Sequence, residues 1–189
     1  FFMPKPRYAS IGKGGLKIFT KEKEKIPEVV RKIITESDIV LEVLDARFPK
    51  ETQNKEIEDY IKNQGKRIIY VLNKADLVEL MKKSFLFPSI YLSSTKRSGG
   101  RMLRNMIKIE AKKIKKEQVV VGVIGYPNTG KSSLINLLIG KSSARISPES
   151  GFTKGVQKLR LTPKIMLLDS PGVIPNNEYS TTEKSGQKH

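Results

Sequence analysis

Residues 125–132 have the sequence Gly125-Tyr126-Pro127-Asn128-Thr129-Gly130-Lys131-Ser132, which matches the pattern G-x-x-x-x-G-K-[ST] of phosphate-binding loops. An apolar run over 119–124 predicts a strand before this loop, and residues 131–138 predict a helix after it. In such a unit the glycines let backbone N–H groups and the helix N-terminus face a phosphate chain. We expect Lys131, at a solvent-lined position, to reach the β- and γ-phosphates and Ser132 to ligate Mg²⁺. The alternative is an ordinary strand-to-helix turn.

The same alternation of apolar runs and helical segments continues on both sides of the loop. Strands are predicted at 39–44, 67–72, 89–92, 119–124, 156–161 and 165–168, and helices at 27–35, 51–62, 99–116 and 131–138. Apolar strands that alternate with helices are typical of a parallel sheet with helices on both faces. The short turn at 162–164 makes the last two strands an antiparallel edge hairpin. The sequence therefore predicts an α/β protein with a P-loop NTPase fold and a mostly parallel six-stranded sheet.

A second motif, Asn73-Lys74-Ala75-Asp76, directly follows the predicted strand 67–72 and matches N-K-x-D. A carboxylate at Asp76 can accept hydrogen bonds from the ring N–H and the exocyclic amine of guanine, whereas adenine would leave it unpaired. We expect Asn73 to brace the loop and the stem of Lys74 to pack along the base. Ser93-Ser94-Thr95 matches the S-A-K position, whose backbone supports guanine, with Thr95 in place of Lys. A capping turn after a strand is the alternative explanation for Asn73 and Asp76.

A third motif, Asp169-Ser170-Pro171-Gly172, matches D-x-x-G, which places a carboxylate near Mg²⁺ and a glycine N–H near the γ-phosphate. Between this motif and the phosphate loop, residues 150–154 predict a loop that supplies a hydroxyl to Mg²⁺ and the γ-phosphate. Thr153 is preferred over Ser150 for this task, because Gly151 lets the chain bend into the site and Thr153 precedes the next strand. Val173 stands where Ras-like GTPases place a catalytic Gln, and an apolar side chain cannot orient water.

The order of these motifs is permuted. Ordinary GTPases have the phosphate loop, the switch Thr and D-x-x-G before N-K-x-D and S-A-K, whereas here the two guanine motifs come first. With this order the chain resembles the circularly permuted GTPases of the YlqF/RbgA-like group, including archaeal members, over about residues 26–174. Asp45-Ala46-Arg47-Phe48-Pro49 matches the D-A-R-x-P segment of that group.

The resemblance implies a GTPase that hydrolyses GTP slowly and acts as a switch in assembly of the large ribosomal subunit. A GTP-regulated RNA-binding module with negligible turnover is the alternative. The nucleotide-binding residues are expected to be Asn73, Lys74, Asp76, Ser93, Ser94, Thr95, Asn128, Thr129, Gly130, Lys131, Ser132, Ser133, Asp169 and Gly172. The expected catalytic residues are Asn128, Lys131, Thr153 and Gly172, and the expected Mg²⁺ ligands are Ser132, Thr153 and Asp169. Asn128 matches the asparagine with which potassium-activated GTPases hold K⁺, although loop geometry alone could explain it.

The charge of the chain points to a polyanionic partner. Its 189 residues include 36 Lys and Arg against 19 Asp and Glu, for a net charge of +17. Such a field attracts RNA, DNA or an anionic membrane surface, and we favour ribosomal RNA or a pre-ribosomal subunit. On the predicted helix 99–116 a stripe of five basic residues is expected to face away from the sheet and to track RNA phosphates; its members are Arg101, Arg104, Lys108, Lys112 and Lys115. A solvated helix face is the alternative.

Several other classes of protein are disfavoured by composition. The chain has no cysteine and one histidine, so a zinc finger, a disulfide scaffold and a Cys–His nucleophile are excluded. The lack of cysteine also argues against the other permuted group, which carries a zinc finger and acts on the small subunit, and Asn73 and Asp76 argue against an ATPase or small-molecule kinase. No apolar run is long enough to span a membrane. We expect a cytoplasmic monomer with a basic arm at 1–25, a GTPase domain at 26–174 and a polar tail, disordered or truncated, at 175–189.

Overall fold

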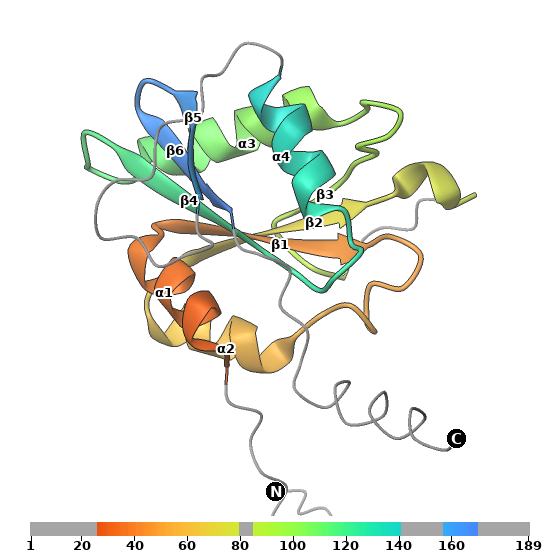
Figure 1. Ribbon diagram of the computed structural model, residues 1–189, viewed down its shortest axis with the longest axis horizontal. Helices are drawn as coiled ribbons and strands as arrows, with labels where there is room; N and C mark the ends of the chain where they lie inside the picture. Colours follow the sequence, from red (N-terminus) through yellow and green to blue (C-terminus); the bar gives the residue numbers. More distant parts are fainter. Residues whose placement is uncertain (1–25, 80–84, 141–156, 170–189) are drawn as a thin grey trace, which may run out of the picture.

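The computed structural model describes residues 26–79, 85–140 and 157–169, and within them a single sheet carries helices on both faces (Figure 1). The strands are β1 (Ile39–Asp45), β2 (Arg67–Asn73), β3 (Ser89–Tyr91), β4 (Val119–Ile124), β5 (Gln157–Thr162) and β6 (Ile165–Asp169). The helices are α1 (Glu28–Glu36), α2 (Lys55–Asn63), the short 3₁₀ helix η1 (Ala75–Leu77), α3 (Gly100–Lys112) and α4 (Lys131–Ile139).

The sheet has the order β3-β2-β1-β4-β6-β5, and only the pair β5 and β6 is antiparallel. The predicted six-stranded, mostly parallel sheet with an antiparallel edge hairpin is therefore confirmed. Because β1, β2, β3, β4 and β6 run parallel, their carboxyl ends meet at one edge of the sheet. The loops at that edge carry the motifs that the sequence singled out.

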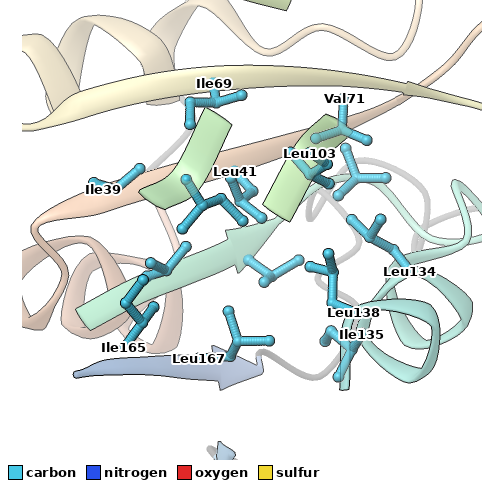
Figure 2. Packing of buried hydrophobic residues seen from close by; sticks show 14 of the residues in the cluster. Ile39, Leu41, Ile69, Val71, Leu103, Leu134, Ile135, Leu138, Ile165 and Leu167 are labelled. Carbon is cyan, nitrogen blue, oxygen red and sulfur yellow. The ribbon is translucent and has the colours of Figure 1, made fainter. Parts of the chain in front are cut away.

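Two apolar layers hold the helices against the sheet, because successive side chains of a strand point to opposite faces. Leu41 and Val43 of β1 belong to the layer under α3 and α4, which Figure 2 shows from close by with Leu103, Leu134 and Leu138 packed against the strands. Val40 and Leu44 of β1 belong to the layer under α1 and α2 on the other face. A strand that is buried on both faces needs apolar residues at nearly every position, which explains the continuous apolar runs of the sequence.

Helix ends differ from the prediction at two places. A helix was expected from residue 51, but α2 begins at Lys55, because the Asn54 side chain caps it by accepting a hydrogen bond from the Ile57 N–H at 3.1 Å. The helix expected over 99–116 ends at Lys112, so Lys115 lies beyond it. The basic arm, the polar tail, Thr153 and Gly172 lie outside the described residues.

Candidate nucleotide-binding site

The phosphate-loop sequence forms the connection between β4 and α4, as its strand–loop–helix context predicts. Gly125 and Gly130 have positive φ angles of 149° and 91°, which side-chain-bearing residues adopt only with strain. Both glycines also lie against backbone or side chains: a Cβ at Gly125 would collide with the Val43 carbonyl oxygen, and one at Gly130 with the Asn73 amide nitrogen. Asn128 also has a positive φ, 62°, a region in which Asn is enriched, and its side chain is exposed. The loop thus depends on glycine where it turns closest to β1 and to the guanine motif.

Lys131 is buried rather than solvent-lined, with 6% of the residue exposed. Its ammonium group donates to the carbonyl oxygens of Gly125 at 2.9 Å and Tyr126 at 2.8 Å. Burial lowers the pKa of Lys131, and the nearby Asp169 carboxylate acts in the opposite direction. The lysine head therefore closes the loop onto the start of α4. The expectation that Lys131 lies at a solvent-lined position is wrong.

The guanine motif is tied directly to the phosphate loop through Asn73, which is 2% exposed. The Asn73 amide donates to the Thr129 carbonyl at 2.9 Å, and its oxygen accepts from the N–H of Ser94 at 3.1 Å and the hydroxyl of Ser94 at 3.0 Å. One amide thus connects the loops that follow β2, β3 and β4. These hydrogen bonds agree with the expectation that Asn73 braces the loop, and its contact with the base stays a prediction.

Asp76 and Ser93 form the second connection between the guanine motifs. The Ser93 hydroxyl donates to Asp76 Oδ1 and accepts from the N–H of Lys96. Ser93 is 3% exposed, whereas Asp76 and Thr95 are exposed. This arrangement holds the Asp76 carboxylate at the surface of the site while a buried hydroxyl orients it.

Two of the residues expected to ligate Mg²⁺ lie at the carboxyl ends of neighbouring strands: Asp169 at the end of β6 and Ser132 in the helix that follows β4. Asp169 ends β6 and is paired in register with Val123 of β4, next to the phosphate loop, and Ser132 is exposed in the first turn of α4. Asp169 Oδ1 is buried and has no hydrogen-bond partner among the described residues. Burial raises the pKa of Asp169, and Lys131 partly offsets this effect. A buried carboxylate oxygen and a serine hydroxyl are donors that suit Mg²⁺, so the residues present fit that ion.

Comparison with known proteins agrees with this geometry. The family described as 50S ribosome-binding GTPase matches residues 120–189. An uncharacterized GTP-binding protein of Methanocaldococcus jannaschii is 46% identical over 176 residues, which cover 90% of this chain and 47% of that protein. Nucleolar GTP-binding protein 2 of Saccharomyces cerevisiae is 36% identical over 179 residues, covering 88% of this chain and 37% of that protein. The chain spans about half or less of the length of these relatives.

Two solved structures have a fold similar to that of this chain. GDP-bound TM YlqF has a TM-score of 0.53 and 26% identity, covering 80% of this chain and 60% of that chain. GNP-bound YlqF from T. maritima has a TM-score of 0.53 at 24% identity, covering 77% of this chain and 56% of that chain, which supports the fold alone. The predicted relationship to circularly permuted YlqF-like GTPases is confirmed. Within this permuted GTPase fold, no helix among the described residues is long and apolar enough to cross a membrane.

The predicted basic stripe on α3 differs from the structure at Arg104. The Arg104 guanidinium donates to the Leu137 carbonyl at 2.8 Å and to the Leu138 carbonyl at 2.6 and 2.9 Å, so it caps the C-terminus of α4. Arg104 therefore holds two helices together and is not a free phosphate contact. The other four members of the stripe are exposed: Arg101, Lys108, Lys112 and Lys115.

Sequence reasoning also missed the partners of Lys74. The Lys74 ammonium donates to Asp45 Oδ2 at 2.9 Å, and Asp45 is in turn bound by Arg47. The D-A-R-F-P segment served only as a mark of the group in the sequence. Its position directly after the predicted strand 39–44 was the available signal that it lies at the same edge of the sheet as the guanine motif.

Proposed function

We propose that this chain binds GTP with Mg²⁺ at the carboxyl edge of its sheet and hydrolyses it slowly to GDP and phosphate. The observation that carries the proposal is the Asn73 amide, which joins the loops that would hold the guanine and the phosphates. A site connected in this way before nucleotide arrives loses less conformational freedom on binding. The relatives named as GTP-binding proteins support the same function.

In this proposal each described group has one task. Asp76 accepts hydrogen bonds from guanine, the stem of Lys74 covers the ring, and backbone N–H groups of the phosphate loop together with Lys131 bind the phosphates. Ser132 and Asp169 hold Mg²⁺, with Thr153 and Gly172 assigned from the sequence alone. When bound, Mg²⁺ neutralises charge on the phosphate oxygens.

Base selectivity tests the site. Fluorescently labelled GDP is titrated against competing GTP, ATP and XTP with the parent protein and with Asp76→Asn. We expect the parent to prefer GTP over ATP, and Asp76→Asn to lose GTP affinity while gaining relative affinity for XTP, because the amide presents a donor where the carboxylate accepted. Asp59→Asn, whose side chain is 74% exposed on α2, is the matched control. Equal affinity of the parent for ATP and GTP would contradict the assignment.

Turnover separates this function from a GTP-regulated RNA-binding module. Phosphate release is measured under single-turnover conditions, in K⁺ and in Na⁺, with and without large ribosomal subunits. Val173 provides no side chain to orient water, so we expect slow release that K⁺ accelerates and Na⁺ does not, and we expect Asn128→Ala to remove the difference. Tight GTP binding with no phosphate release in any condition would favour the RNA-binding module.

We further propose that the partner is ribosomal RNA within a pre-ribosomal large subunit. The net charge of +17 and the exposed cations of α3 support an RNA contact on the face opposite α1 and α2. A cavity of about 400 Å³ between α3, α4 and β5 is lined in part by Lys108 and Gly140. The printed names of the matching family and of nucleolar GTP-binding protein 2 support a ribosomal setting.

A further inference from the structure

The loop that follows β1 lies between the two nucleotide loops, because β1 pairs with β2 on one side and with β4 on the other. Asp45 ends β1 opposite Asn73 of the guanine motif, and the Ala46 N–H donates to the Asn73 carbonyl at 2.7 Å. The side chain of Asp45 therefore enters the site from the centre of the sheet. None of the tasks assigned above uses it.

The Asp45 carboxylate is buried, with 5% of the residue exposed, and is fully hydrogen-bonded. Arg47 binds it with two side-chain nitrogens, at 2.9 and 2.7 Å, and with its backbone N–H at 3.1 Å. Lys74 adds a fourth bond at 2.9 Å. These partners, Arg47 first and Lys74 second, hold the pKa of Asp45 well below its usual range, so the carboxylate is charged near neutral pH.

The carboxylate fixes a side chain that would otherwise be mobile. A lysine has four rotatable bonds, and its head would sample many positions in water. Lys74 also has a left-handed backbone conformation, with φ 61° and ψ 33°, which is unusual for a residue other than glycine. With its ammonium group held by Asp45, the Lys74 stem is fixed at both ends, and its methylene groups are kept in one place.

We propose that Asp45 is a positioning residue for guanine-nucleotide binding: it holds the Lys74 head so that the lysine stem forms one wall for the base before nucleotide arrives. The inference rests on the guanine loop proposed above. It assigns the D-A-R-F-P segment two separable parts, since Asp45 acts on Lys74 while Arg47 fixes the turn that contains Asp45.

A double-mutant cycle tests the proposal in the full chain. GDP affinity and the thermal unfolding temperature without nucleotide are measured for the parent, Asp45→Asn, Lys74→Met and the double variant. Methionine keeps the length of the stem and removes the charged head. We expect each single change to weaken GDP binding about tenfold, and the double variant to bind no more weakly than Lys74→Met alone, because residues that act through one contact are not additive.

Two control variants separate positioning from stability. Asp38→Asn changes the same residue type at the other end of β1, where Asp38 accepts from Lys116 and from the Val120 N–H, so it should lower the unfolding temperature without affecting GDP. Arg47→Gln removes the other partner of Asp45 and leaves Lys74 in place, so GDP affinity should fall less than threefold.

The outcomes distinguish this proposal from the one on which it rests. Unchanged GDP affinity in Asp45→Asn, with weakened binding in Lys74→Met, would overturn the positioning role and leave the guanine loop intact. Additive losses in the double variant, or an Arg47→Gln loss equal to that of Asp45→Asn, would also overturn it. If neither Lys74→Met nor Asp76→Asn changes GDP binding, the guanine loop itself is wrong.

Discussion

Lys131 shows how one residue can serve both binding and stability. Its ammonium group lies 2.9 and 2.8 Å from two loop carbonyls and is buried, so a phosphate ligand would have to compete for the same protons. Hydrogen bonds to a charged group contribute about 1.5–3 kcal/mol each. The residue is therefore placed where its removal should affect the apo protein as well as the complex.

We predict that Lys131→Ala weakens GTP binding by about tenfold to 100-fold and lowers the free energy of unfolding by about 1–3 kcal/mol, because two carbonyls lose their donor while the cost of burying the ammonium group is removed. Isothermal titration and urea unfolding measure the two effects. Lys164→Ala, at an exposed position in the β5–β6 turn, is the control. An Ala variant that unfolds like the parent would mean that water replaces the ammonium group at no loss.

Glu42 is a buried acid that the proposed nucleotide chemistry does not use. It lies on the α2 face of β1, accepts from the Asn54 N–H at 3.1 Å through Oε1, and has no hydrogen-bond partner for Oε2 among the described residues. Burial, with the nearby Glu58 adding to it, raises the pKa of Glu42 to about 8. The folded protein therefore retains a proton that the unfolded chain releases near its ordinary pKa.

We predict that stability falls as pH rises from about 5 to above 8. In that window the folded state binds more protons than the unfolded state, so the free energy of unfolding has a negative slope with pH, and the loss is complete once both states are ionised. Glu42→Gln should flatten this dependence and raise the melting temperature at pH 9 by a few degrees. Melting curves from pH 5 to 9 measure it, and equal slopes for parent and variant would contradict the protonated state of Glu42.

At the scale of elements, the contact between α3 and α4 depends on Arg104. Its guanidinium binds the last two carbonyls before the end of α4, where the helix dipole also favours a cation. We predict that Arg104→Gln lowers the free energy of unfolding by about 1–3 kcal/mol, since buried carbonyls lose their partners. Arg101→Gln, on the same helix and exposed, should change it by less than about 0.5 kcal/mol. Denaturant unfolding of both variants measures the difference.

The strands could be predicted within about a residue, whereas helix ends and single side-chain roles could not. Near-continuous apolar runs such as Ile39–Leu44 leave one choice for a buried strand, and the glycines of the phosphate loop fix the turn after β4. The start of α2 is set by the Asn54 cap, which accepts from the Ile57 N–H three residues on. Asn54 is held in turn by a hydrogen bond from its N–H to Glu42, twelve residues away, which no local pattern contains. Spacing placed Arg104 on the basic face of a helix, but whether a long side chain turns toward a neighbouring helix is decided by packing.

The sequence could predict that the site binds a guanine nucleotide, because the residues of each motif are contiguous in sequence. The contacts between motifs could not, since the bond from Asn73 to Thr129 joins residues 56 positions apart and the bond from Lys74 to Asp45 joins residues 29 apart. Such pairs follow from strand order, which the sequence suggests, and from rotamers, which it does not. The permuted order of the motifs along the chain does not separate them in space. The order of the strands in the sheet brings their loops together at one edge.

At the scale of the whole molecule, the cations behind the net charge of +17 include, among the described residues, both exposed ones and ones that hold the fold together. Arg104 is engaged with α4, and Glu110, the only acid of α3, is held by Lys113 at 2.6 Å and Arg67 at 2.8 Å. Lys108 and Lys112 are exposed on the same helix. RNA contacts of this face should therefore come from the exposed members of the stripe, Lys108 and Lys112 among them, and not from Arg104.

We predict that Lys108→Gln/Lys112→Gln weakens binding to ribosomal RNA of any sequence and reduces the slope of log affinity against log salt by about 1.4–1.8, because each lost phosphate contact removes about 0.7–0.9 from the slope. GTP affinity should not change, because these lysines lie on α3, over one face of the sheet, whereas the nucleotide loops lie at the carboxyl ends of the strands. Lys55→Gln/Lys62→Gln makes the same change of net charge on α2, across the sheet, and should alter the slope much less. Titrations from 50 to 300 mM KCl (roughly the range in which counterion release dominates) measure the slopes.

Equal slopes for the two double variants would mean that only total charge matters and that α3 is an ordinary solvated face.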